Sequence, residues 1–313
     1  MKILIIQQKM IGDVLTSGSL FEIIKTRFPD AILHYVINQH TKPVVLNHPY
    51  INELKIVTPE MEHSIFKLIR FSKTLRIENY DFVIDLYAVY SSNIVSLFCG
   101  AKQKISKGKW YTKFIYDYLI TETRDSKTEA GLALENRLKY LEPLGLNDLK
   151  PIKPKIYLTT EEKNQTRAFL ESKNIDLEKS LYMISVLGSD ETKTLPFKYM
   201  AKVLDQIVAT KPESQLLFNY IPKQVEDANA IFNLCKLETQ QHIRLDVFGS
   251  SLRDFICITS FCTALIGNEG GAVNMAKAVN VPTFTIFSPW IKKETWSLFE
   301  NEATNVSVHL KDY

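Results

Sequence analysis

The chain has 313 residues, of which 45% are hydrophobic and 23% charged, and its formal net charge is +3. These values are ordinary for a folded globular protein, and the length suits two α/β domains better than one hydrophobic core. This net charge is too small to indicate nucleic-acid binding by itself.

The cysteines, the histidines and the N-terminus each argue against a class of protein. The four cysteines have no C-x-x-C spacing and the six histidines form no H-E-x-x-H pattern, which predicts buried free thiols and no built-in metal site. The stretch "MKILIIQQKM" lacks the apolar core of a secretory signal, and no run of about 18 apolar residues predicts a membrane span. We therefore expect a cytoplasmic protein.

Predicted strands alternate with predicted helices along the first half of the chain. Apolar residues at helical spacing and a stop at Pro29 predict a first helix. Pro151 and Pro154 disfavour helix and central strand, so we place a domain linker there. The predicted strands are 2–7, 32–38, 53–57, 81–87 and a short exposed strand at 102–107, and the predicted helices are 13–28, 62–78 and 92–99.

The alternation restarts after the linker. Strands are predicted at 181–187, 215–220, near Ile243, 263–267 and 283–287, and helices at 160–172, 196–210, 224–235, 251–260 and 272–279. Alternating strands and helices imply parallel sheets, so the predicted class is α/β, with two Rossmann-like, doubly wound domains at residues 1–152 and 153–313. The last helix is expected to pack back on the first domain. In such folds ligands bind beyond the carboxyl ends of the strands, and a cleft between domains is the default site.

The first strand-to-helix turn, "QQKMIGDVLTSGSL", carries a carboxylate where a helix begins. Gly12 permits close approach of the backbone, and Asp13 opens the helix, with Ser17 in the next turn. Asp13 has two interpretations: a first-turn acid favoured by the helix dipole, or a general base at the carboxyl edge of the sheet. The turn lacks G-x-G-x-x-G, which disfavours a nicotinamide site.

Two turns in the second half have features that suit a phosphate group. In "SVLGSDETKTLP", small hydroxyl residues and Lys193 stand at a helix entrance, although the spacing of a P-loop is absent. In "IGNEGGAVNMAKA", Glu269 and two glycines precede a helix, so free N–H groups could hold an anion and the carboxylate could accept from a ribose. Each turn also fits a plain solvated loop, and the two together favour a nucleotide.

Stretches along nearly the whole chain resemble glycosyltransferase family 9, the ADP-heptose:lipopolysaccharide heptosyltransferases. They are, in order, "KILIIQQKMIGDVLTSGSLFEIIKTRFPDAILHYVI", "HPYINELKIV", "YDFVIDLY", "LFCGAKQKI", "ENRLKYLEPLGL", "LGSDETKTLPFKYMAKV" and "SLRDFICITSFCTALIGNEGGAVNMAKAVNVPTFTIFSP". The resemblance implies a GT-B fold, with two Rossmann-like domains facing each other across a cleft. It also implies inverting chemistry without a metal or other cofactor, an acceptor-side N-terminal domain and a C-terminal domain that binds the nucleotide sugar.

The resemblance assigns roles to residues of this sequence. Asp13 matches the catalytic base, and Gly12 and Ser17 fall on the acceptor side. The implied donor-binding residues are Gly188, Ser189, Lys193, Glu269, Gly270, Gly271, Ala272 and Asn274. The donor loop departs from the family pattern, because Glu269 replaces an aspartate, Gly270 a threonine and Asn274 a histidine.

These matches predict an enzyme that transfers a sugar, expected to be heptose from ADP-heptose, to a lipopolysaccharide core or a related glycan. The changed donor loop leaves open a non-catalytic or altered-specificity nucleotide-sugar-binding relative. A GT-B epimerase is a further alternative, which would need more acid/base groups in the cleft. No nucleic-acid partner is expected.

A lipid A-linked acceptor would bring the protein to the inner face of the inner membrane. The stretch "GAKQKISKGKWYTKF" interleaves lysines with aromatic residues, a pattern that suits an anionic surface, sugars or simply a solvated loop. Its lysines are Lys102, Lys104, Lys107, Lys109 and Lys113, and its aromatic residues are Trp110, Tyr111 and Phe114.

Overall fold

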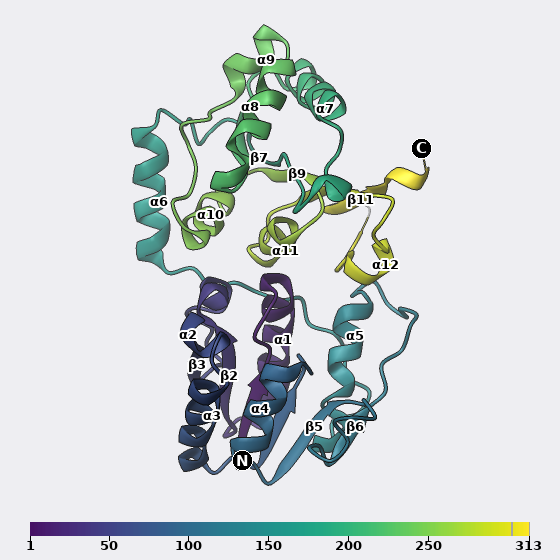
Figure 1. Ribbon diagram of the computed structural model, residues 1–313. Helices are drawn as coiled ribbons and strands as arrows, with labels where there is room; N and C mark the ends of the chain where they lie inside the picture. The colour runs from purple at the N-terminus through teal and green to yellow at the C-terminus, as the bar shows by residue number, and fades with distance from the viewer. Residues whose placement is uncertain (302, 313) are drawn as a thin grey trace. The chain divides into compact units, whose positions relative to one another are not determined.

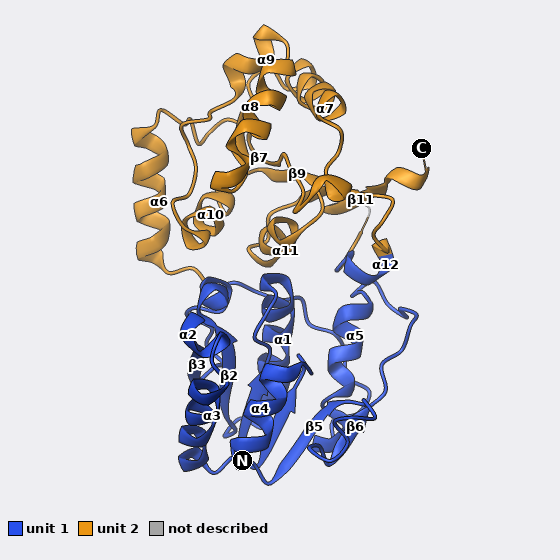
Figure 2. Ribbon diagram, in the orientation of Figure 1, with its two compact units in different colours: residues 1–156, 294–298 blue, residues 157–293, 299–313 orange. Residues whose placement is uncertain are grey.

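The computed structural model of the chain describes residues 1–301 and 303–312. It divides into two compact units, which Figure 2 colours separately. Unit 1 comprises residues 1–156 and 294–298, and unit 2 comprises residues 157–293 and 299–313. The first part of unit 1 therefore ends a few residues beyond the linker position inferred from the prolines. Unit 1 also includes residues 294–298, a short segment near the C-terminus. Leu298 of that segment is 3% exposed and packs against Gly131 of unit 1.

The sheet of unit 1 is fully parallel and has the strand order β3-β2-β1-β4-β5-β6. Its strands are β1 (Lys2–Ile6), β2 (Ile32–Asn38), β3 (Glu53–Val57), β4 (Phe82–Asp85), β5 (Gln103–Lys107) and β6 (Tyr118–Ile120). Strand order reverses between β1 and β4, the place where doubly wound sheets bind ligands at the carboxyl ends of their strands.

Helices cover both faces of this sheet (Figure 1). They are α1 (Ile11–Arg27), α2 (Pro59–Glu62), α3 (Ile65–Thr74), α4 (Tyr90–Phe98) and α5 (Leu132–Lys139), with short 3-10 turns η1 (Gln39–Val44), η2 (Leu75–Glu78) and η3 (Glu142–Leu144). Leu4 and Ile6 pack with α3 and α4 on one face. Tyr35 points to the opposite face, where its ring lies 4.8 Å from that of Phe21 on α1.

Unit 2 has a second parallel sheet with the order β11-β10-β9-β7-β8. Its strands are β7 (Leu181–Ser185), β8 (Gln215–Asn219), β9 (Ala264–Asn268), β10 (Thr283–Phe287) and β11 (Asn305–His309). Its helices are α6 (Thr160–Ser172), α7 (Phe197–Thr210), α8 (Val225–Leu234), α9 (Leu237–His242), α10 (Leu252–Thr259) and α11 (Gly271–Ala278), with η4 (Glu191–Lys193), η5 (Pro222–Gln224) and η6 (Leu310–Asp312). The order reverses between β7 and β9. The short helix α12 (Lys293–Trp296) joins the units in sequence.

Two parallel sheets with helices on their faces confirm the predicted α/β class, and some predicted elements were wrong. The strand at 102–107 is not an exposed edge, because β5 lies between β4 and β6 and Ile105 is fully buried. The helix predicted at 62–78 is interrupted, since Ser64 caps a new helix that starts at Ile65. Near Ile243 there is only an isolated bridge to Leu216. None of the helices in the described part of the chain is long and apolar enough to cross a membrane.

Candidate functional site

The carboxyl edge of the unit 1 sheet carries Asp13 at the strand-order reversal. β1 ends at Ile6, four residues form a turn, and α1 begins at Ile11, so Asp13 lies in the first turn of the helix. The N-cap residue Met10 gives no side-chain hydrogen bond to the helix. The Asp13 carboxylate therefore supplies the negative charge that a helix N-terminus favours, while 24% of its side chain remains exposed.

Arg137 on α5 holds this carboxylate from a neighbouring helix. Its Nη2 lies 2.5 Å from Asp13 Oδ1, its Nε donates to Ser17 Oγ at 2.9 Å, and its Nη1 donates to the Ala133 carbonyl at 2.7 Å. Ser17, expected on the acceptor side, is completely buried, and its hydroxyl accepts from Arg137. Gly12 is half-buried, and its carbonyl accepts from the Thr16 hydroxyl at 2.7 Å.

Two loops flank the strand-order reversal of unit 2, at the carboxyl ends of β7 and β9. The first runs from Gly188 to Leu195 and contains Lys193, and the second runs from Glu269 into α11. Neighbouring parallel strands bring their carboxyl ends to one edge of the sheet, so the two loops that resemble phosphate-binding turns are adjacent.

The lysine loop folds back tightly on its own first residue. A Cβ added at Gly188 would lie 2.3 Å from the Lys193 carbonyl oxygen, so only glycine fits there. Ser189 donates to Asp190 Oδ2 at 2.9 Å, and this bond and a stronger one from Thr192 hold the pKa of Asp190 below its ordinary value. Among the described residues, no carboxylate lies within 4.0 Å of the Lys193 ammonium, which leaves that charge available to a ligand.

The Glu269 loop opens directly onto a helix N-terminus. Gly270 is the N-cap of α11 and offers no side chain, and the first turn of α11 contains no acid. A Cβ built at Gly270 or Gly271 meets no atom within 4 Å, so the backbone here borders open space. Burial raises the pKa of the Glu269 carboxyl, the charge on Lys193 lowers it, and the charge on Asp190 raises it. The loop thus combines unpaired N–H groups with one partly buried carboxyl group.

Asn268, the last residue of β9, joins the two loops. Its side chain is 1% exposed, its Oδ1 accepts from the Leu195 N–H at 2.7 Å, and its Nδ2 donates to the carbonyls of Ser185 and Val186 at 3.0 Å each. The amide therefore fixes the end of the lysine loop against β7 and β9. Ala272 and Asn274 lie half-buried in the first turns of α11, beside the open glycines.

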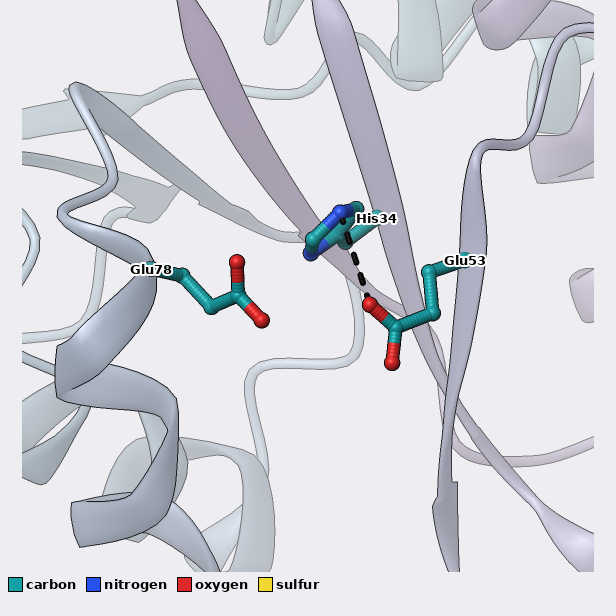
Figure 3. Close-up of side chains that lie close together, drawn as sticks. All are labelled: His34, Glu53 and Glu78. Carbon is teal, nitrogen blue, oxygen red and sulfur yellow. Dashed lines mark ion pairs between the residues drawn. The ribbon is translucent and has the colours of Figure 1, made fainter.

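A separate cluster of His34, Glu53 and Glu78 lies at the amino end of the unit 1 sheet (Figure 3). Its three side chains could in principle ligate a metal, but lysines already bind both carboxylates. Lys55 donates to Glu53 and Glu78 at 2.7 Å, and Lys2 donates to Glu78 at 2.8 Å. These bonds lower the pKa of Glu78 to about 2, and burial lowers the pKa of His34. We interpret the cluster as a charge network that closes this end of the sheet.

A cavity of about 490 Å³ lies between α6 and α10 in unit 2. Its polar side chains bond one another: Arg253 Nε donates to Glu162 at 2.7 Å, and the Ser250 hydroxyl donates to Asp254 at 2.6 Å. Because these groups are already paired, we assign the cavity no catalytic role.

The family model for glycosyltransferase family 9 (heptosyltransferase) matches residues 68–313. The chain belongs to this family. It is therefore an enzyme of the glycosyltransferase type, and the resemblance read from the sequence is confirmed. The matched range contains both loops of unit 2 and Arg137, and it begins after Asp13.

Relatives and solved structures of family 9 extend the match to most of the chain. The lipopolysaccharide heptosyltransferase 1 of Campylobacter coli is 25% identical over 295 residues, which cover 92% of this chain and 84% of that protein. The structure of a family 9 member from Veillonella parvula has a TM-score of 0.84 at 18% identity and covers 98% of this chain and 86% of its own. The Escherichia coli ADP-heptose lipopolysaccharide heptosyltransferase II has a TM-score of 0.78 at 19% identity, with 99% and 90% covered. These likenesses confirm the GT-B fold.

Sequence reasoning missed two residues of this glycosyltransferase, Arg137 and Asn268. Arg137 lies in α5, a helix that was not among the predicted elements, and its partner Asp13 is 124 positions away in the chain. Asn268 was recognised as part of a loop but not as the group that connects two loops. A polar residue at the end of an otherwise apolar strand was the available signal for Asn268, since a buried amide needs hydrogen-bond partners.

Proposed function

We propose that this family 9 glycosyltransferase moves a heptose from ADP-heptose to an acceptor of the lipopolysaccharide core, with inversion at the anomeric carbon. The observation that carries the proposal is the pair of loops at the β7–β9 reversal, where the charge of Lys193 and the N-terminus of α11 border the Glu269 carboxyl. A lysine and helix N–H groups suit a diphosphate, and a carboxylate suits the hydroxyls of a ribose. The names of the Campylobacter and Escherichia coli relatives supply the heptose, the ADP and the lipopolysaccharide.

In the proposed reaction Asp13 acts as the general base. The acceptor hydroxyl oxygen forms a bond to the anomeric carbon, and its proton passes to the Asp13 carboxylate. The bond between the anomeric carbon and the diphosphate oxygen breaks, and its electron pair leaves with the nucleoside diphosphate. One displacement inverts the carbon, so a single base is sufficient.

The departing diphosphate gains negative charge, which preorganised donors stabilise. Lys193 offers a mobile point charge, and the N–H groups of Gly271 and Ala272 begin an uncapped helix. We propose that these groups suffice without a metal ion or other cofactor. Unchanged turnover after treatment with a chelator is the expected result, and loss of turnover that Mg²⁺ restores would contradict it.

A calorimetric titration with ADP, UDP, GDP and CDP tests the donor assignment. We expect selective binding of ADP, which Lys193→Ala weakens because the phosphate contact is lost. Lys202→Ala is the matched control, since Lys202 is an exposed lysine on α7 outside the two loops. Preference for another nucleotide would keep the transferase and change its donor. Absence of binding would contradict the proposed donor and favour the alternative of a donor loop altered at Glu269, Gly270 and Asn274.

We further propose a cytoplasmic location with peripheral contact to the inner membrane through residues 108–114. Trp110 is 84% exposed and Phe114 is 77% exposed, which is unusual for large aromatic side chains. Lys102 is paired with Asp81 and Lys107 with Glu122, so these two lysines are less available to anionic lipids. The aromatic residues would therefore contribute most of the membrane contact.

Co-sedimentation with vesicles that contain anionic phospholipid tests this contact. Trp110→Ala combined with Phe114→Ala should reduce the bound fraction. Phe66→Ala on α3, where the ring is 83% exposed, is the control for general surface hydrophobicity. Equal loss in both variants, or no binding by the unmodified protein at low salt, would overturn the proposed surface.

A further inference from the structure

Asp13 is held by only one of its two carboxylate oxygens. Arg137 Nη2 donates to Oδ1, and among the residues that the structure describes no donor is bonded to Oδ2. A carboxylate fixed in this way has a defined orientation and a second oxygen whose lone pairs remain available.

Arg137 is itself immobilised on three sides. Its Nε donates to the buried Ser17 hydroxyl and its Nη1 to the Ala133 carbonyl one helical turn earlier, and its side chain is 11% exposed. Ser17 and Asp13 both lie on α1, four residues apart and therefore on the same helix face. The guanidinium thus spans two points of α1 from α5 and fixes the direction of the Asp13 side chain.

The helix beneath Asp13 is also held firmly. The Tyr35 hydroxyl, on the fully buried Tyr35 side chain, donates to the Val14 carbonyl at 3.0 Å. Val14 follows Asp13 directly, so the backbone next to Asp13 is held from the sheet, and the carboxylate itself is held from α5.

We propose that Arg137 is the positioning residue of the general base: it fixes Asp13 Oδ1 so that Oδ2 is the oxygen that takes the proton of the acceptor hydroxyl. This inference rests on the proposed function of Asp13. Arg137 acts through Asp13 and does not bind the acceptor or the donor. Misplacement of a catalytic group by about 1 Å can cost on the order of 10²-fold in rate, so the orientation of Asp13 governs turnover.

A double-mutant cycle on turnover tests this inference, with ADP-heptose as donor and a lipopolysaccharide-core acceptor that lacks heptose. The variants are Arg137→Met, which keeps the aliphatic stem, Asp13→Asn, and the double variant. We expect Arg137→Met to lower kcat by about 10²-fold while the KM values and the Kd for ADP stay unchanged. The double variant should be no slower than Asp13→Asn, because Arg137 has no path to the reaction other than Asp13.

Two further variants separate positioning from folding. Arg137→Lys keeps the charge but loses the fork that reaches Asp13 and Ser17 together, so it should restore only a small part of kcat. Arg253→Met removes a comparably buried arginine that pairs with Glu162 at 2.7 Å on α6, so it should lower thermal stability without lowering kcat.

The possible outcomes separate the inference from the proposed function. If the unmodified protein binds ADP but transfers no heptose, the proposed function fails and the inference fails with it. If the unmodified protein is active and the losses of the two single variants multiply in the double variant, Arg137 acts independently of Asp13 and the inference is overturned. A raised KM for the acceptor in Arg137→Met would also overturn it, because it would make Arg137 a substrate-binding residue.

Discussion

The β1–α1 turn of unit 1 and the β9–α11 turn of unit 2 have the same topology but different surfaces. Each follows a parallel strand at a strand-order reversal and leads into a helix whose N-cap residue gives no side-chain hydrogen bond. α1 carries its own anion, Asp13, in its first turn, whereas the first turn of α11 has no acid. The positive end of a helix is therefore satisfied internally in unit 1 and left for a ligand in unit 2. Under the proposed function, the same backbone arrangement holds a base in unit 1 and binds an anion in unit 2.

The largest expected effects are those of replacing Asp13 in unit 1 and Lys193 in unit 2. The comparison would fail if Asp13 proved to bind the nucleotide and Lys193 proved to matter only for turnover. Asp13→Asn should lower kcat by about 10²–10⁴-fold and leave the affinity for ADP unchanged, because the base is lost and the donor loops are intact. Lys193→Ala should instead weaken ADP binding as well as turnover. Steady-state kinetics and calorimetry on both variants provide the measurement. Wild-type turnover in Asp13→Asn would show that this acid only complements its helix.

The pH dependence of stability should be next in size, and it concerns unit 1. His48 is 7% exposed, lies beneath Gly18 of α1, and burial lowers its pKa from 6.5 to about 4. The folded-state pKa is below the unfolded-state value, so its contribution is complete above pH 6.5 and is lost as the pH falls toward 4. A shift of this size corresponds to about 3 kcal/mol.

His48→Gln should remove the part of the acid-induced loss of stability that comes from protonation of His48. Chemical denaturation at pH 7.5 and at pH 4.5 measures the free energy of unfolding, and the difference between the two values should be smaller in the variant than in the unmodified protein. Equal differences in both proteins would mean that His48 is protonated in the folded state.

A pair of glycine variants tests whether the two loops of unit 2 leave room for an added Cβ atom. Gly188→Ala should lower the free energy of unfolding by about 1–3 kcal/mol and weaken ADP binding, because the new Cβ would displace the Lys193 backbone. Gly271→Ala meets no atom within 4 Å and should leave stability unchanged or raise it by up to about 1 kcal/mol, because alanine favours a helix. Thermal unfolding and calorimetry check both. A variant at Gly188 that keeps full stability would mean that the lysine loop is not fixed.

The smallest expected effect concerns Glu269 and has the opposite pH direction to that of His48. Burial raises its pKa above the ordinary 4.5, so the folded state disfavours the charged form. The ionised Glu269 carboxylate therefore destabilises the folded state. This destabilisation is absent below pH 4.5 and grows as the pH rises through the raised folded-state pKa. Glu269→Gln should therefore increase stability at pH 8 relative to the unmodified protein and change it little at pH 4. A variant less stable at pH 8 would show that the carboxylate is stabilised by its surroundings.

The site residues in the turns that follow strands were predictable from the sequence, and those that act across the fold were not. Asp13, Lys193 and Glu269 lie in turns or helix starts after short apolar runs, so the order of the elements alone places them at the carboxyl edges of the sheets. Arg137 belongs to α5, a helix of only 8 residues that was not predicted, and nothing in its local sequence indicates that it packs against α1. Asn268 was visible at a strand end, but only the pairing of β9 with β7 shows which carbonyls its amide reaches.

The course of the chain between the units has a consequence for attempts to cut the protein into pieces. The backbone passes from one unit to the other at residues 156–157, again at 293–294 and again at 298–299. A cut near Ile156 would leave residues 294–298, which belong to unit 1, on the C-terminal piece, although Leu298 packs against Gly131 on the N-terminal piece. Expression of residues 1–156 alone would uncover the surface that Leu298 occupies. Splitting the chain at that point yields two halves that need each other to complete unit 1.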